Sequence, residues 1–111
     1  MGAIKYLFIC SANRNRSKAA ERICKDLAQA KGKNIECQSA GVHELAERRV
    51  TKYLADWADR IFVMEEYMSD ILVSNYEQKP EKIIVFDIPD IYVIYDPILE
   101  QILIKKIEKY V

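Results

Sequence analysis

The chain has 111 residues, 50% of them apolar, and its 17 basic residues balance its 17 acidic residues. This length allows one compact domain with a hydrophobic core, so we expect residues 1–111 to form a single domain. Balanced charge, and the lack of any apolar run near the roughly 20 residues that cross a bilayer, give no reason to expect a nucleic-acid or membrane partner.

The first part of the chain predicts a strand, a helix and a second strand. Residues 3–9 form a nearly continuous apolar run, which is typical of a strand buried on both faces. A helix is expected over residues 17–30, with Ser17 as its N-cap. Residues 35–39 form a short candidate strand, which Gly41 brings to an end.

The rest of the chain continues the alternation of helix and strand. Residues 45–58 are expected to be helical, in one or two pieces, and Thr51 is a plausible cap for the second piece, in which Tyr53 and Leu54 share a face with Trp57. The later elements are a strand over 60–64, a helix over 65–73 with Tyr67 pointing inward, a strand over 82–88, and a helix from Pro97, capped by Asp96, to the C-terminus.

This order of elements predicts the fold class. Apolar strands that alternate with amphipathic helices indicate an α/β domain with a four-stranded parallel sheet and helices on both faces. In such folds ligands bind beyond the carboxyl ends of the strands, where the strand order reverses. The loop after the first strand is therefore the first place to look for a site.

That loop has the composition of an anion site. Its residues are Cys10, Ser11, Ala12, Asn13, Arg14, Asn15, Arg16 and Ser17. Unpaired backbone N–H groups and the helix dipole attract an anion at a helix N-terminus, and a curled loop can aim several N–H groups at one oxyanion. Arg16 adds a planar fork that suits two phosphate oxygens, whereas Arg14 is expected at the rim or in solvent.

Cys10 is the candidate nucleophile. Its thiol ends the first strand and faces the same N–H groups; a helix N-terminus and a nearby arginine lower the pKa of a thiol. A nucleophile at the floor of an anion cradle is what covalent phosphoryl transfer requires, and a general acid must then protonate the leaving group. A cysteine at a strand end is more often a packing residue, but the spacing to Arg16 and the Ser17 after it favour function.

The other cysteines do not predict a metal or disulfide site. Cys24 and Cys37 are expected to be small buried residues, and their spacing fits neither a zinc site nor a disulfide framework. The chain has a single histidine, so no metal and no cofactor are expected. Free thiols and the lack of a signal peptide point to the cytoplasm.

The chain resembles the low-molecular-weight protein tyrosine phosphatases, and more closely a short branch of that superfamily. The motif "CSANRNRS" at 10–17 carries the family pattern of a Cys, five residues and Arg-Ser/Thr. Three further stretches have family counterparts in the same order: "SAG" at 39–41, "WADRIFVME" at 57–65 and "DIPDIY" at 87–92. The resemblance thus covers nearly the whole length.

The resemblance implies a role for each residue that matches the motif. Cys10 would form a phosphocysteine intermediate, and Arg16 would bind phosphate and stabilise the transition state. Asn13 would hold the loop in its strained shape, and Ser17 would stabilise the thiolate. These roles describe a phosphatase that hydrolyses a phosphate monoester, with protein phosphotyrosine or a small phosphate ester as substrate.

The general acid is implied by the same resemblance. The family's acid stands in a Pro-Asp-Pro-Tyr-like segment, which Pro89 to Tyr92 match, so Asp90 is the candidate and Asp87 the alternative. An acid that must be protonated predicts an acidic pH optimum. The segment 43–59 is shorter than its counterpart in longer members, which carries the aromatic residue that flanks phosphotyrosine.

Competing functions stay open at this stage. A non-catalytic module could hold phosphate or a phosphoprotein on the same loop without turnover. Arsenate reductase shares the fold and the loop, but its chemistry needs resolving cysteines later in the chain, and none follows Cys37. The physiological substrate and the oligomeric state are also open.

Overall fold

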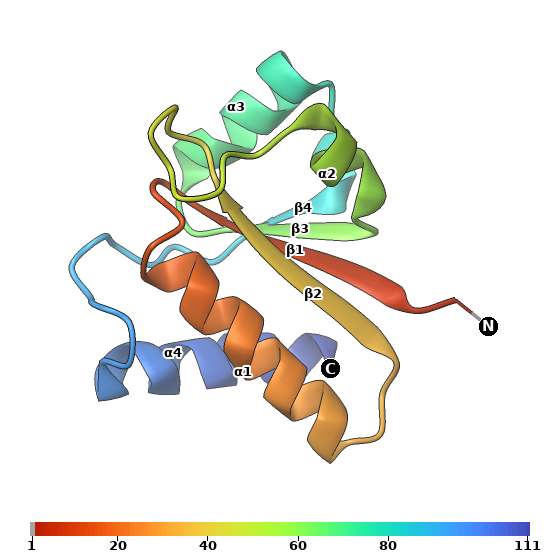
Figure 1. Cartoon of the computed structure of the whole chain (residues 1–111), viewed down its shortest axis with the longest axis vertical. Coiled ribbons are helices and arrows are strands. Elements are labelled where there is room, and N and C mark those ends of the chain that lie inside the picture. Colours follow the sequence, from red (N-terminus) through yellow and green to blue (C-terminus); the bar gives the residue numbers. More distant parts are fainter. Residues whose placement is uncertain (1) are drawn as a thin grey trace.

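Four parallel strands form one sheet, which confirms the predicted α/β fold class (Figure 1). The computed structural model describes residues 2–111. The strands are β1 (Ile4–Cys10), β2 (Ile35–Gly41), β3 (Arg60–Val63) and β4 (Ile83–Val85), in the order β2-β1-β3-β4. The chain leaves β1 for β2 on one side and returns to β3 on the other. The order therefore reverses at β1, and the carboxyl end of β1 is where a ligand site is expected.

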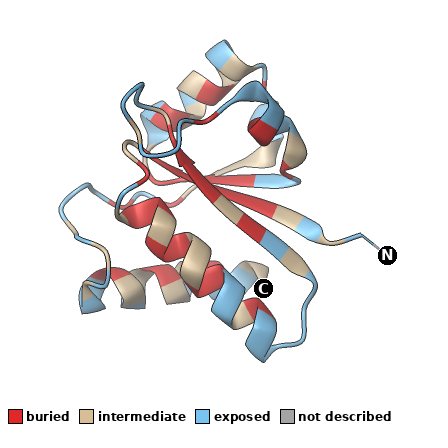
Figure 2. Ribbon diagram, viewed as in Figure 1, coloured by how far each residue is buried: buried red, intermediate tan, exposed pale blue. Residues whose placement is uncertain are grey.

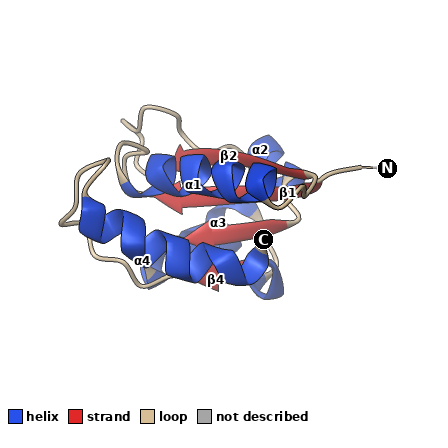
Figure 3. Cartoon of the chain, turned by 90° about the horizontal axis from the view of Figure 1, so that it is seen from below, coloured by secondary structure: helices blue, strands red, loops and turns tan. Residues whose placement is uncertain are grey.

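Helices cover both faces of the sheet, as predicted. They are α1 (Arg16–Ala30), α2 (Lys52–Trp57), α3 (Glu66–Tyr76) and α4 (Pro97–Ile107), and single 3-10 turns lie at Pro80–Lys82 and Glu108–Tyr110. Helices α1 and α4 pack side by side on one face, while α2 and α3 lie on the opposite face (Figures 1 and 3). Within residues 2–111, none of the helices has the length and apolarity that crossing a membrane requires.

The core lies along β1 and β3, which are buried along most of their length (Figure 2). Phe8 of β1 stacks on Phe62 of β3 with ring centroids 5.0 Å apart, and Phe86 packs against Phe62 at 5.2 Å. The Tyr6 hydroxyl donates to the Tyr110 carbonyl at 2.7 Å, which ties the C-terminal turn to the first strand. This packing fixes β1, and with it the position of the loop that begins at Cys10.

The prediction of helix over 45–58 is wrong for its first half. Only α2 forms, with Thr51 as its cap, since the Thr51 hydroxyl accepts from Leu54 N at 3.1 Å. The preceding segment instead lays its backbone on the loop after β1: His43 N donates to Ser11 O and Glu47 N to Ala12 O, both at 3.0 Å. These contacts satisfy the backbone groups that a helix would otherwise pair.

Three other expectations need correction. Ser17 does not cap α1: the helix begins at Arg16, and the Ser17 hydroxyl lies 2.9 Å from Cys10 Sγ instead. Strand β4 is shorter than 82–88: Lys82 belongs to the 3-10 turn at Pro80–Lys82, and the strand ends at Val85, shortly before the left-handed φ of 56° at Asp87. Tyr67 and Tyr53 face solvent rather than the core, with 46% and 85% of their surface exposed. In contrast, the Asp96 cap is confirmed, since its carboxylate accepts from Ile98 N at 2.8 Å.

Gly41 is needed for space, because three chain segments meet at the end of β2. A Cβ at this position would lie 2.5 Å from Ser11 O, 2.7 Å from Ala46 Cβ and 2.9 Å from Asn13 N. Two of these neighbours are backbone atoms of the loop after β1, which cannot move without changing the shape of that loop. Glycine at position 41 therefore allows β2 and the loop to approach closely.

Gly41→Ala should lower the free energy of unfolding by about 2 kcal/mol, because overpacking against backbone forces the segments apart. The measurement is urea unfolding followed by circular dichroism. Gly2→Ala is the matched control, since nothing lies within 4 Å of the Cβ it would add. A Gly41→Ala protein as stable as the control would contradict the close approach.

Candidate active site

The loop after β1 encloses a cavity of about 150 Å³ at the carboxyl end of the sheet. It is lined by Cys10, Ser11, Ala12, Arg14, Asn15, Arg16 and Asp90. A water molecule occupies about 30 Å³ in the liquid, so the cavity has room for a small tetrahedral anion with little space to spare. The sequence analysis named all of these residues, and the fold brings them together across most of the chain.

Two asparagines hold the loop in its curled shape. Asn13 has a φ of 53°, a left-handed conformation that asparagine tolerates better than most residues, and only 2% of its surface is exposed. The Asn15 side chain accepts from the backbone N–H of Ile94 at 2.9 Å. The loop is therefore tied directly to the segment between β4 and α4, which carries Asp90.

The sulfur of Cys10 has two hydrogen-bond partners, one in the loop and one in the first turn of α1. The backbone N–H of Asn13 donates to Cys10 Sγ at 3.2 Å, and the hydroxyl of Ser17 lies 2.9 Å from the same atom. Cys10 is 3% exposed and lines the cavity. Cys10 Sγ therefore has two hydrogen-bond partners inside the site, and the Ser17 hydroxyl is positioned either to donate to the sulfur or to accept from it.

Arg16 is a buried charge with one open donor. Its Nη1 donates to Glu65 Oε2 at 2.7 Å and to the Ile88 carbonyl at 2.6 Å, and its Nε lies 3.7 Å from Asp90 Oδ1. Only 1% of the Arg16 side chain is exposed, and its Nη2 has no partner within residues 2–111. A buried donor without a partner is costly. An oxyanion in the adjacent cavity would satisfy it.

The two candidate acids lie in different places. Asp90 lines the cavity beside Cys10 and has 60% of its side chain exposed. Asp87 lines a separate cleft of about 370 Å³, together with Glu65, Glu66, Tyr67, Ile88 and Pro89. The geometry favours Asp90 as the proton donor to a group bound over Cys10, and the assignment stays a prediction.

Tyr67 lies on the first turn of α3 and lines the cleft that contains Asp87, not the cavity over Cys10. Burial raises the pKa of Tyr67, and the carboxylates of Glu65 and Asp90 raise it further, while Arg16 lowers it. The ring is therefore close enough to feel the charges of the site, although 46% of its surface is exposed.

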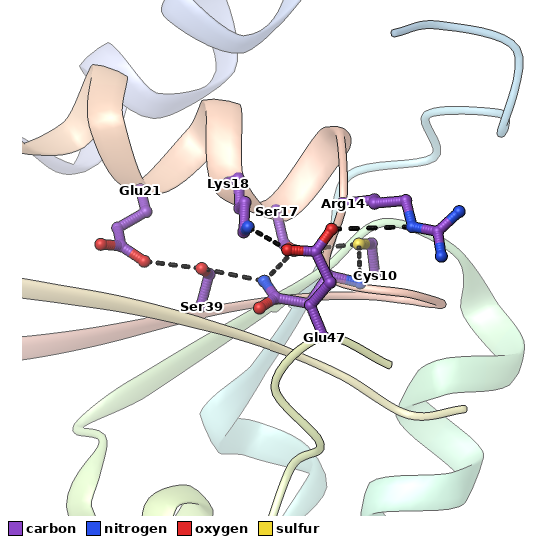
Figure 4. A network of polar contacts seen from close by, with 8 residues as sticks. Cys10, Arg14, Ser17, Lys18, Glu21, Ser39 and Glu47 are labelled. Carbon is purple, nitrogen blue, oxygen red and sulfur yellow. Dashed lines mark hydrogen bonds and ion pairs between the residues drawn. The ribbon is translucent and has the colours of Figure 1, made fainter. Parts of the chain in front are cut away.

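Sequence reasoning missed three polar residues that support the loop. Glu65 pairs with Arg16, and Ser39 and Glu21 continue the hydrogen bonds of Asn13 away from Cys10 (Figure 4). Their positions carried a signal. Glu65 follows β3, the neighbour of β1, and Ser39 pairs with Phe8 in the sheet register, so both are near the carboxyl end of β1.

Arg14 lies at the rim, as expected. Its Nε is 3.6 Å from Glu47 Oε2, and 67% of its side chain is exposed. Lys18 contacts the other oxygen of the same carboxylate (Figure 4). The hydrogen bond from Lys18 lowers the pKa of Glu47, and the nearby Arg14 charge acts in the same direction. This surface cluster docks the 43–50 segment on the loop.

The remaining cysteines contact each other away from the cavity. The Cys37 thiol donates to Cys24 Sγ at 2.7 Å, and both residues are buried. This hydrogen bond, and burial, raise the pKa of the Cys24 thiol, which keeps it neutral. Within the described residues, no group of three His, Cys, Asp or Glu side chains is placed to hold a metal ion.

The sequence matches one family profile and several solved structures. The profile described as "Low molecular weight phosphotyrosine protein phosphatase" matches residues 5–60, about half of the chain. A low molecular weight protein tyrosine phosphatase from T. tengcongensis is 22% identical with a TM-score of 0.80, over 98% of this chain and 100% of that one. A search of curated proteins found no match.

Two further solved structures share the fold. The tyrosine phosphatase Wzb from Escherichia coli K30, in complex with phosphate, is 24% identical with a TM-score of 0.75, over 96% of this chain and 98% of that one. The YwlE arginine phosphatase, in a mutant form with a phosphorylated active-site serine, is 20% identical with a TM-score of 0.74, over 96% and 97%. At this identity the likeness shows a common fold.

Glu65→Ala should lower the free energy of unfolding by about 2 kcal/mol, because it leaves the buried Arg16 charge without its carboxylate partner; a fully buried pair would cost more. Urea unfolding is the measurement. Glu66→Ala is the matched control, since Glu66 is the next residue, is exposed and makes no ion pair or side-chain hydrogen bond in the described part of the chain. Equal effects of the two substitutions would contradict the role of Glu65.

Proposed function

Because the chain belongs to the low molecular weight phosphotyrosine protein phosphatase family, whose members are cysteine-dependent phosphatases, we propose that it hydrolyses phosphate monoesters through a phosphocysteine intermediate on Cys10. Protein phosphotyrosine is the proposed preferred substrate. One observation carries the proposal: Cys10 Sγ, with two hydrogen bonds, and Arg16, with an open donor, line the same small cavity. We also propose that residues 1–111 act as one domain.

In the first proposed step the thiolate of Cys10 attacks phosphorus. The S–P bond forms while the bond between phosphorus and the leaving oxygen breaks, and Asp90 gives its proton to that oxygen. The Arg16 guanidinium and the backbone N–H groups of the loop hold the non-bridging oxygens as their charge grows. The Arg16 guanidinium is already held in position to bind these oxygens, because Glu65 and the Ile88 carbonyl both accept from its Nη1.

In the second step a water molecule attacks the phosphocysteine. Asp90, now a carboxylate, takes a proton from the water, the S–P bond breaks, and inorganic phosphate and the Cys10 thiolate are released. The donors from Asn13 N and Ser17 Oγ lower the energy of the thiolate as a leaving group. The same residues therefore serve both steps.

The rim of the cavity supports an aromatic phosphate ester as substrate. The segment 43–50 is folded against the loop, so it builds no high wall beside the cavity. Tyr67 is partly exposed in the cleft that also contains Asp87, and the charges of Glu65 and Asp90 help to raise its pKa, so its ring is near enough to the site to stack on a tyrosyl group. We propose that Tyr67 takes the place of the aromatic wall of longer relatives.

The alternatives have less support. A binding module needs neither an acid nor an activated nucleophile, yet Asp90 lines the cavity and Cys10 Sγ has two hydrogen-bond partners. Arsenate reduction needs a cysteine that can reach a Cys10 adduct. Cys24 and Cys37 are buried against each other and do not line the cavity.

The wild-type protein should hydrolyse p-nitrophenyl phosphate at mildly acidic pH, and Cys10→Ser should show no turnover. Asp90→Ala should lose a factor of roughly 100 to 10,000 in kcat, the typical contribution of a positioned acid. Asp87→Ala is the matched control and should lose much less, because Asp87 faces the other cleft. Slight and equal losses in all three variants would favour the binding module.

Tyr67→Ala should raise KM for a phosphotyrosine peptide by about five- to tenfold with little change in kcat, because an aromatic pair contributes about 1 kcal/mol. Inhibition by inorganic phosphate, which has no ring, should stay at the wild-type level. Tyr53→Ala, an exposed tyrosine on α2, is the control. Steady-state kinetics with phosphotyrosine and phosphoarginine peptides gives both the test of Tyr67 and the substrate preference.

A further inference from the structure

A chain of hydrogen bonds runs from the surface of α1 to the sulfur of Cys10 (Figure 4). The Ser39 hydroxyl donates to Glu21 Oε1 at 2.6 Å, and Asn13 Nδ2 donates to Ser39 Oγ at 3.0 Å. The same Asn13 nitrogen donates to Ser17 Oγ at 2.9 Å, and Ser17 Oγ lies 2.9 Å from Cys10 Sγ. The links come from β2, the loop and α1, so they join elements that the sequence separates.

The carboxylate of Glu21, at the end of the hydrogen-bond series farthest from Cys10, fixes the direction of each hydrogen bond in the series. A carboxylate only accepts, so the hydroxyl hydrogen of Ser39 must point to Glu21, and Ser39 Oγ can then accept from Asn13. Asn13 must turn its NH₂ group, not its oxygen, toward both serines. Ser17 Oγ therefore receives a hydrogen from Asn13, and its own hydrogen is left for the sulfur.

The opposite direction is chemically possible when the carboxylate is absent. The Ser39 hydroxyl could then donate to the oxygen of a flipped Asn13 amide, and Ser17 would donate to that oxygen as well. Cys10 would lose its side-chain donor and keep only the backbone N–H of Asn13. The direction of the chain thus decides whether the thiolate is stabilised.

We propose that Glu21 is a positioning residue of the phosphatase: through Ser39 and Asn13 it sets the direction in which the Ser17 hydroxyl donates, and so favours the ionised form of Cys10. This inference rests on the proposed role of Cys10 as nucleophile. Glu21 touches neither the sulfur nor the cavity over it, and acts only through the intervening side chains.

The inner residues of this series of hydrogen bonds are buried, which protects the links from exchange with water. Asn13, Ser17 and Ser39 are 2%, 0% and 3% exposed, so water cannot easily replace one of the links. Glu21 itself is partly exposed, and Lys25 holds its other oxygen at 2.6 Å. The outer end lies in a cavity of about 550 Å³, whose lining includes Glu21, Ser39 and Asn13 but not Cys10.

Direct electrostatics and the proposed chain predict opposite signs. Removing a negative charge near a thiol favours the thiolate, so a purely Coulombic role predicts that Cys10 ionises at lower pH without Glu21. Loss of the Ser17 donor predicts ionisation at higher pH. The other ionisable groups that face Cys10 from the loop, from α3 and from the β4–α4 segment are Arg14, Arg16, Tyr67 and Asp90, and they are the same in every variant.

The experiment measures the pH dependence of Cys10 alkylation by iodoacetamide, with the modified peptide quantified by mass spectrometry. Glu21→Ala should move the midpoint upward by about one pH unit, the scale of one hydrogen bond to a charged group. Glu21→Gln should move it less, because the amide oxygen can still accept from Ser39. Asp26→Ala, which removes an exposed charge of the same helix that also lines the larger cavity, should not raise it.

A double-mutant cycle tests the path. Ser39→Ala should raise the midpoint like Glu21→Ala, and Glu21→Ala should add no further rise in the Ser39→Ala background. A midpoint that falls or stays unchanged in Glu21→Ala, or equal downward shifts in Glu21→Ala and Glu21→Gln, would overturn the inference. Urea unfolding confirms that each variant is folded, and if one is not, the others carry the comparison.

The assay also separates two kinds of failure. Alkylation reads the thiol and needs no turnover, so the role of Glu21 can be judged even if the wild-type protein hydrolyses no phosphate ester. In that case the proposed function fails while the hydrogen-bond chain stands. Normal hydrolysis together with an unmoved midpoint in Glu21→Ala has the opposite meaning: the phosphatase proposal stands and Glu21 has no positioning role.

Discussion

The burial of the Arg16 guanidinium is the constraint on which the rest of the site depends. A charged group that is 1% exposed must be paired from several directions. Glu65, at the start of α3, and the Ile88 carbonyl, after β4, both accept from Nη1, and Asp90 approaches a second nitrogen, Nε. The Arg16 side chain thereby joins the segments that follow β1, β3 and β4 at one edge of the sheet, and its Nη2 is left without a partner in the described residues.

The backbone that follows Gly41 supports the loop after β1 on the side of β2. The segment after β2 gives its N–H groups to the carbonyls of the loop after β1, so those carbonyls point away from the cavity. The loop N–H groups are then free to face an anion, as a nest requires. The connection between β2 and α2 thus helps to fix the shape of the loop after β1.

The sequence predicted the sheet and the position of the loop after the first strand well, because both depend on local patterns. Apolar runs marked the strands, and the spacing of Cys10 and Arg16 marked the loop. The failures have a common physical cause, which is contact between distant segments. Residues 45–50 have a helix-like pattern, but their backbone is used to dock on the loop. The sequence indicated that Glu65 lies at a helix start. It did not indicate the ion pair of Glu65 with Arg16, because the two residues are 49 positions apart.

The link between Asn15 and Ile94 has a consequence for biosynthesis. The two residues are 79 positions apart, and the bond joins the first loop to the segment that carries the carboxylic acid. The ribosome makes the loop that contains Cys10 well before the segment that contains Asp90. Contacts of such long range also slow folding. The hydrogen bond between Asn15 and Ile94 therefore forms only after both segments have been synthesised, so the cavity that both segments line is completed after the loop itself has been made.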